Sequence, residues 1–135
     1  MRPVSFHWEA MGERMARVLK ALGDVNRMKI IKVLASNPDE SVCVSDMADI
    51  IGISQPATSQ HIAVLRGVDL LVPKRAGNRT YYRIDPEKLM EYRSLLDHMF
   101  RMVFVRCEHD GRCESCPARR DCDEQERAAL TQGAR

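Results

Sequence analysis

The chain has 135 residues, which is enough for one domain with a single buried core. Its 21 Lys and Arg residues nearly balance its 19 Asp and Glu residues, so the net charge of +2 does not by itself favour any class of partner. No stretch approaches the roughly 18 apolar residues of a membrane span, and charged residues interrupt the N-terminal positions, so we expect a cytoplasmic protein with no signal peptide and no membrane partner.

Two helices are predicted at the start of the chain. Apolar residues recur at helical spacing from Trp8 to Leu22, and Gly23 ends the run. Asp24 can cap a second helix, which the sequence Ser36-Asn37-Pro38 would end. The buried stripe of this second helix would consist of Ile30, Ile31 and Leu34.

The stretch from Ser45 to His61 has the pattern of two short helices joined by a tight turn. Gly52 stands where the first helix would end and can take a left-handed conformation, and Ser54 can cap the next helix. This pattern is typical of a helix-turn-helix. The second helix would turn Thr58, Ile62 and Leu65 toward the core. Its outward face, which could read DNA, would carry Gln55, Ser59, Gln60 and Ala63.

Two strand-like segments, 72–75 and 80–84, flank a Gly-Asn turn and predict a β-hairpin of the kind called a wing. Basic residues are concentrated on the second helix of the helix-turn-helix and on the wing. Between Ser54 and Arg83 there are five of them against the single acid Asp69, so the net charge of this stretch is +4 (five minus one). The five are Arg66, Lys74, Arg75, Arg79 and Arg83. Positive charge on the second helix of a helix-turn-helix and on its wing indicates contact with DNA phosphates.

A last long helix is predicted after the wing. Asp85 can cap it and Pro86 can begin it, and a broad apolar stripe then runs from Leu89 to Val103. This stripe could pair with the first helix as a dimer interface, or it could be ordinary core packing.

Three segments of this chain, 21–34, 54–61 and 75–82, together resemble the ArsR family of bacterial winged-helix repressors. The resemblance covers about residues 10–104. It implies a mostly α fold with a small β wing, which dimerises through the first and last helices. It also implies a homodimer that binds double-stranded operator DNA and responds to a small effector.

The resemblance assigns candidate DNA contacts to two elements. On the recognition helix they are Ser54, Gln55, Ser59, Gln60 and His61, and on the wing they are Arg75, Arg79 and Tyr81. Glutamine can bond adenine through two hydrogen bonds, whereas serines and arginines more often hold phosphates. The alternative for each is a solvated surface side chain, and His61 could instead pack against the scaffold.

The family's common metal sites are largely missing from this sequence. Its arsenite and cadmium sensors often carry a Cys-x-Cys pair just before the first helix of the helix-turn-helix, where this chain has Cys43 and Ser45. One thiolate chelates a soft metal weakly, so we expect Cys43 to be a buried structural residue. Asp97 and His98 are adjacent, so they would point to different sides of a helix and lack the partners of a closed site.

Four of the five cysteines lie instead near the C-terminus, with the spacing Cys-x5-Cys-x2-Cys-x5-Cys. Reduced thiols at such spacing can converge on one centre, and the predicted ligands are Cys107, Cys113, Cys116 and Cys122. Zinc usually uses two short knuckles, whereas a cubane cluster tolerates longer spacers. The segment resembles the iron-sulfur loop of endonuclease III, which favours a 4Fe-4S cluster, with zinc or a soft-metal or thiol sensor as alternatives.

The predicted organisation is a winged-helix and dimerisation domain at 1–104, a cysteine-rich segment at 105–124 and a flexible tail at 125–135. The predicted function is a dimeric transcriptional repressor whose operator binding depends on the cysteine centre. A remote alternative is a DNA-repair enzyme, suggested only by the loop that resembles the one in endonuclease III. The sequence lacks the helix-hairpin-helix of those enzymes, so we expect no enzymatic activity.

Overall fold

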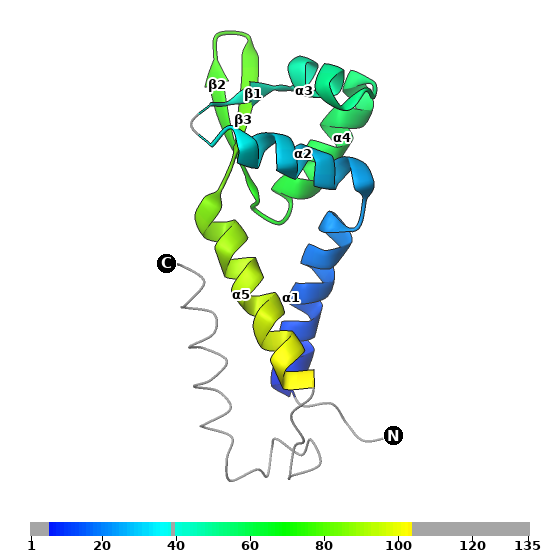
Figure 1. Cartoon of the computed structure of the whole chain (residues 1–135), viewed down its shortest axis with the longest axis vertical. Coiled ribbons are helices and arrows are strands. Elements are labelled where there is room, and N and C mark those ends of the chain that lie inside the picture. Colours follow the sequence, from blue (N-terminus) through cyan, green and yellow to red (C-terminus); the bar gives the residue numbers. More distant parts are fainter. Residues whose placement is uncertain (1–5, 39, 104–135) are drawn as a thin grey trace. The chain divides into compact units, whose positions relative to one another are not determined.

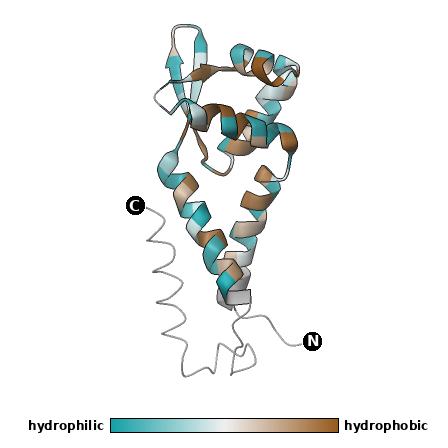
Figure 2. Ribbon diagram, viewed as in Figure 1, coloured by the Kyte–Doolittle hydropathy of each residue, from teal (hydrophilic) through white to brown (hydrophobic). Residues whose placement is uncertain are grey.

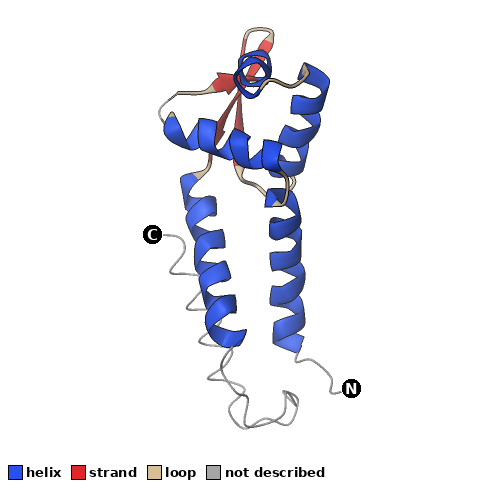
Figure 3. Ribbon diagram, turned by 45° about the vertical axis from the view of Figure 1, so that its right-hand side comes forward, coloured by secondary structure: helices blue, strands red, loops and turns tan. Residues whose placement is uncertain are grey.

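The computed structural model describes residues 6–38 and 40–103, with side chains from residue 11 to residue 101 except at position 39. In chain order the elements are α1 (Phe6–Leu22), α2 (Val25–Ser36), β1 (Val42–Cys43), α3 (Val44–Ile51), α4 (Gln55–Arg66), β2 (Leu71–Ala76), β3 (Arg79–Ile84) and α5 (Pro86–Val103). Figure 1 shows these elements, and Figure 3 separates helices from strands by colour. The predicted fold class, a mostly helical winged helix-turn-helix, is confirmed.

The predicted caps form as expected because each places a side-chain oxygen over free backbone N–H groups. Asp24 caps α2 by accepting from the N–H groups of Asn26 and Arg27. Asp85 does the same for α5, where its Oδ1 accepts from Glu87 and Lys88. Both helices therefore begin where the sequence predicts.

The strands form one antiparallel sheet in the order β1-β3-β2. β2 and β3 pair along their full length, from Leu71 opposite Ile84 to Ala76 opposite Arg79. β1 pairs with the other edge of β3, with Val42 opposite Tyr82 and Cys43 opposite Tyr81. The wing is thus joined by backbone hydrogen bonds to the residues that lead directly into α3.

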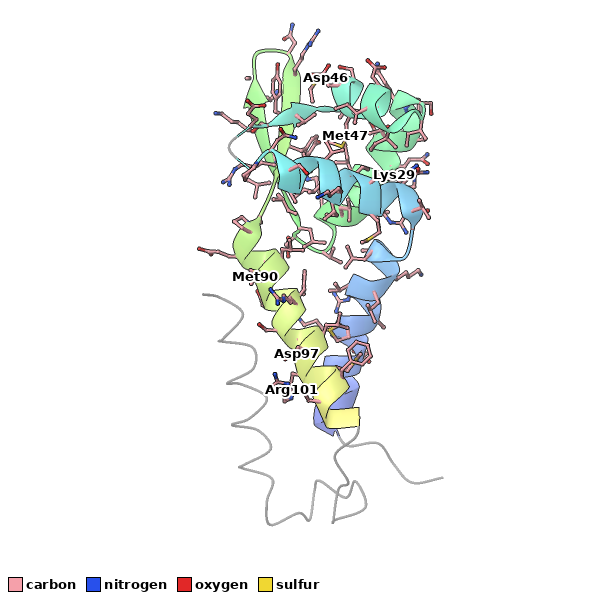
Figure 4. The ribbon with its side chains drawn as sticks, viewed as in Figure 1. Lys29, Asp46, Met47, Met90, Asp97 and Arg101 are labelled. Atoms are coloured by element: carbon pink, nitrogen blue, oxygen red, sulfur yellow. The ribbon has the colours of Figure 1, made fainter. Side chains whose placement is uncertain are left out.

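Contacts divide the chain into two compact units, and residues 18–89 form one of them. Its core is built from the buried faces of α2, α3, α4 and the sheet, and Figure 2 shows the apolar residues on these elements. Ile30 and Leu34 of α2, Met47 of α3 and Leu65 of α4 are fully buried (Figure 4 labels Met47). The predicted stripe of α2, which includes Ile31, is confirmed.

The other unit contains α1 up to Arg17 and α5 from Met90. Met11, Met15 and Leu95 form its buried cluster, and Leu96 and Met99 pack against it. Arg14 forms an ion pair with Glu91 and lies over the ring of Tyr92, with its Cζ 5.6 Å from the ring centroid. Part of the predicted α5 stripe is therefore core within one chain.

Two apolar residues of that stripe are exposed. Phe100 is 57% exposed, and Met90, which Figure 4 labels, is 38% exposed. No helix among the described residues has the length and apolar character needed to cross a bilayer. The predicted boundaries after residues 104 and 124 lie outside the described residues.

Candidate nucleic-acid interface

The turn between α3 and α4 depends on two residues. Gly52 ends α3 with φ +81°, a conformation that a side chain would strain. Its N–H and that of Ile53 both donate to the carbonyl of Ala48, at 2.8 and 3.2 Å. Ser54 then caps α4, and its Oγ accepts from the N–H of Ala57 at 3.2 Å. These bonds fix the angle at which α4 leaves the scaffold.

The recognition helix α4 has one buried face and one exposed face, as predicted. Thr58, Ile62 and Leu65 are buried, and the hydroxyl of Thr58 donates to the Ser54 carbonyl at 2.9 Å. That bond satisfies the one polar group on the buried face. Gln55, Ser59, Gln60 and Ala63 are exposed, and so is the capping Ser54. The outward face therefore offers amides and hydroxyls to solvent.

The wing carries its charge at the tip. Gly77 takes the first central position of the two-residue turn with φ +61°, which suits a type II′ hairpin. Arg75 and Arg79 lie on either side of this turn, and both are exposed. Tyr81 is half-buried opposite Lys74 of β2 and Cys43 of β1.

All five basic residues counted between Ser54 and Arg83 are exposed. Arg66, at the end of α4, lies over the ring of Tyr82 on β3, with its Cζ 6.0 Å from the ring centroid. A guanidinium over an aromatic face is attracted to it while its N–H groups stay free for other partners. This contact places one cation between the recognition helix and the wing.

His61 is placed differently from the other candidates on α4. Its side chain is only 19% exposed, and its Nδ1 lies 3.2 Å from Nη1 of Arg27 on α2. The same Nδ1 lies 3.9 Å from Oδ1 of Asp24. The sequence pattern did not indicate Arg27, because no local spacing relates residues of α2 and α4.

The pKa of Asp24 is lowered from its ordinary value of 3.8. The main cause is the hydrogen bond that its carboxylate accepts from the Arg27 N–H. Desolvation opposes this shift, while the Asn26 N–H, the charge of Arg27 and the charge that His61 carries when its ring is protonated add to it. Asp24 is therefore ionised at neutral pH and faces both Arg27 and His61.

Cys43 is 3% exposed, as expected for a structural cysteine. Its Sγ lies 3.1 Å from Oδ2 of Asp46 and 3.2 Å from Oγ of Ser45. Among the described residues no group of three or more His, Cys, Asp or Glu side chains is arranged to hold a metal ion. The predicted ligands Cys107, Cys113, Cys116 and Cys122 lie outside the described residues.

Comparison with known proteins identifies the family. A family profile described as "Bacterial regulatory protein, arsR family" matches residues 24–71, which contain the helix-turn-helix. An uncharacterized HTH-type transcriptional regulator, MJ1325 of Methanocaldococcus jannaschii, is 31% identical over 87 residues, which are 64% of this chain and 96% of that protein. This chain belongs to the arsR family. A second relative, the transcriptional repressor SmtB homolog of Synechocystis, is 31% identical over 64% of each chain.

Solved structures of similar proteins share the fold of this chain. NolR from Sinorhizobium fredii superposes with a TM-score of 0.60 at 28% identity, covering 74% of this chain and 97% of that one. The homodimeric winged helix-turn-helix DNA-binding domain Mb0332 from Mycobacterium bovis shares the fold, with a TM-score of 0.56 at 24% identity over 78% and 94% of the two chains.

Membership in the arsR family confirms the prediction of a helix-turn-helix transcriptional regulator and not an enzyme. The eight candidate DNA contacts stay predictions. The structure brings them onto two elements of one compact unit, α4 with its cap and the β2-β3 hairpin.

Proposed function

We propose that this chain is a cytoplasmic, homodimeric repressor that binds operator DNA by placing α4 in the major groove and the wing in an adjacent groove between the two phosphate backbones. The observation that carries this proposal is the composition of the exposed surface. Amides and hydroxyls cover the outward face of α4, and five exposed cations lie on α4 and the adjoining hairpin. Amides discriminate bases, and cations hold phosphates.

The test begins with a duplex selected by the full-length protein from a random-sequence library. Gln55→Ala and Gln60→Ala are each expected to weaken binding to that duplex and to relax the sequence preference at one position, by about 1–3 kcal/mol of discrimination. The matched control is Gln132→Ala, the same substitution in the chain's tail. Failure of the wild-type protein to select any duplex would refute the proposal.

The homodimer is supported by the open part of α5. Phe100 and Met90 are exposed apolar residues on this helix, and the fold neighbour Mb0332 is homodimeric. Phe100→Glu is expected to give a monomer in analytical ultracentrifugation, because a charge at an apolar interface would be left without a partner. Arg101→Glu is the control for added negative charge, since Arg101 is already exposed and paired with Asp97 (Figure 4). A Phe100→Glu dimer as stable as wild type would place the interface elsewhere.

We also propose that Cys107, Cys113, Cys116 and Cys122 hold a 4Fe-4S cluster and that operator binding depends on it. The support is the cysteine spacing. Such a cluster would supply a redox centre held by four thiolates. The four cysteines follow α5 directly in sequence, so their ligation would constrain the chain beyond that helix.

Protein purified without oxygen is the material for testing this centre. Iron, sulfide and zinc analysis together with the visible absorption spectrum would distinguish a cluster from zinc and from free thiols. Cys116→Ser is expected to lose the metal, whereas Cys43→Ser should retain it because Cys43 is buried beside β3. Equal operator affinity of loaded and metal-free protein would reject the regulatory role, and the metal centre would then only stabilise the end of the chain.

A further inference from the structure

Arg27 joins three elements within the unit formed by residues 18–89. From the first turn of α2 its Nε donates to the carbonyl of Ala21 at 2.5 Å, and its Nη2 donates to the carbonyl of Lys20 at 3.1 Å. Both carbonyls belong to the last turn of α1, where the helix leaves acceptors free. Its Nη1 lies 3.2 Å from Nδ1 of His61 on α4. The guanidinium therefore connects the end of α1 to the recognition helix.

The contact between Arg27 and His61 determines which nitrogen of the imidazole carries the proton. A guanidinium has N–H donors and no acceptor, so Nδ1 of His61 must be the acceptor and must lack a proton. Asp24 Oδ1 is 3.9 Å from that nitrogen, which is beyond hydrogen-bonding distance. The same oxygen already accepts from the N–H groups of Asn26 at 2.8 Å and Arg27 at 3.2 Å. A neutral ring in this setting has its proton on Nε2.

We propose that Arg27 is a positioning residue for DNA recognition, which holds His61 in one orientation and as the Nε2–H tautomer so that Nε2–H donates to an acceptor of the duplex. The inference rests on the proposed operator binding. DNA presents acceptors to such a donor as purine N7 atoms in the major groove and as phosphate oxygens. With 19% of its side chain exposed, His61 is mostly inside the protein, and the rest of its surface is open to solvent.

The tautomer can be measured without DNA. In full-length protein labelled with 15N-histidine, long-range proton-nitrogen correlation spectra at neutral pH distinguish a protonated Nε2 from a protonated Nδ1. His61→Gln removes one set of signals and thereby assigns them. We expect His61 to be the Nε2–H form in wild type and a mixture of tautomers in Arg27→Met. A protonated Nδ1 in wild type would overturn the inference.

The role in binding is tested on the duplex selected by the wild-type protein. Arg27→Met is expected to weaken binding by about tenfold to a hundredfold, the effect of losing one well-placed hydrogen bond in each chain of the dimer. His61→Ala should weaken binding at least as much as Arg27→Met, because it removes the Nε2–H donor itself. In the His61→Ala background the Arg27→Met change should cost less than about twofold, which would show that the two residues are coupled.

The control is Lys29→Met, which removes one positive charge from an exposed site on the same helix (Figure 4). It should leave affinity within about twofold of wild type. An equal loss from Arg27→Met in both backgrounds would mean that Arg27 acts on the fold and not through His61, and would overturn the inference. Wild-type binding to no duplex would instead reject the proposed function itself.

Two modified duplexes distinguish the possible acceptors. Replacing purines by 7-deazapurines removes the N7 acceptor, and methylphosphonates remove the charge and an acceptor oxygen of the backbone. If His61 donates to a base, one 7-deaza substitution should abolish the difference between wild type and Arg27→Met. If it donates to the backbone, one methylphosphonate should do so. A difference that survives every such substitution would overturn the inference.

Discussion

The two arginines at the tip of the wing lie on opposite faces of the hairpin. Directly opposed residues of an antiparallel pair share a face, and Arg75 is opposite Thr80 whereas Arg79 is opposite Ala76. Neighbouring residues 75 and 76 point to opposite faces, so Arg75 and Arg79 do as well. A hairpin that lies in a groove between two phosphate backbones would thus offer one cation to each wall.

Removing both arginines gives a magnitude that can be calculated. Each neutralised phosphate contributes about 0.9 to the slope of log affinity against log salt. The Arg75→Ala/Arg79→Ala variant removes two contacts per chain, so the slope of a dimer should fall by about 3.6. A fourfold rise in salt would then cost the variant about a hundredfold less affinity than it costs wild type.

The assay is fluorescence anisotropy with the selected duplex over a series of salt concentrations. Each single variant should lower the slope by half as much as the double variant, because each arginine contacts a different phosphate backbone. Arg101→Ala removes one exposed cation from α5, outside the helix-turn-helix and the wing, and should leave the slope unchanged. If only one wing arginine changes the slope, the wing lies flat on a single backbone. If neither does, our reasoning about the wing is refuted.

Three further predictions concern residues that stabilise the helix-turn-helix and the helix α2 in the same compact unit. Ser54→Ala removes the cap of α4 and should lower the free energy of unfolding by about 1 kcal/mol in chemical denaturation, whereas Ser54→Asp should retain it. Leu65→Ala empties a fully buried site and should cost about 2–5 kcal/mol, against less than about 1 kcal/mol for Val64→Ala, which is exposed; equal costs would contradict the core we describe. Asp24→Asn keeps the α2 cap but removes a carboxyl whose pKa is held below 3.8. The stability that Asp24 contributes is present above pH 3.8 and lost as the pH falls through the lower folded pKa, so acid unfolding of Asp24→Asn followed by circular dichroism should be less steep below pH 3.8.

Local signals in the sequence predicted most of the helix-turn-helix and the wing. Caps and turns depend on residues within four positions of one another, so Asp24, Gly52 and Ser54 could be assigned from spacing alone. The buried face of α4 followed from helical periodicity. The wing followed from a Gly-Asn turn between β-branched and aromatic residues.

Long-range contacts were beyond those signals. β1 has two residues, too few to show the alternation that marks a strand, and it forms only because β3 has a free edge. Arg27 and His61 are separated by 34 positions, and neither residue type indicates the other. The α5 stripe could be read from the sequence, but which of its residues are covered could not, because periodicity identifies a face and not its partner.

The attachment of the wing at its base has a consequence for how such hairpins can diverge. β1 holds only the Tyr81 and Tyr82 portion of β3, so the free end can grow or shrink without disturbing that attachment. Adding one residue to each strand would rotate the tip by half a turn and exchange the sides on which its cations project. Adding two residues to each strand would return the cations to their original sides. We therefore expect natural length variation in this hairpin to occur in steps of four residues wherever the charges at its tip are retained.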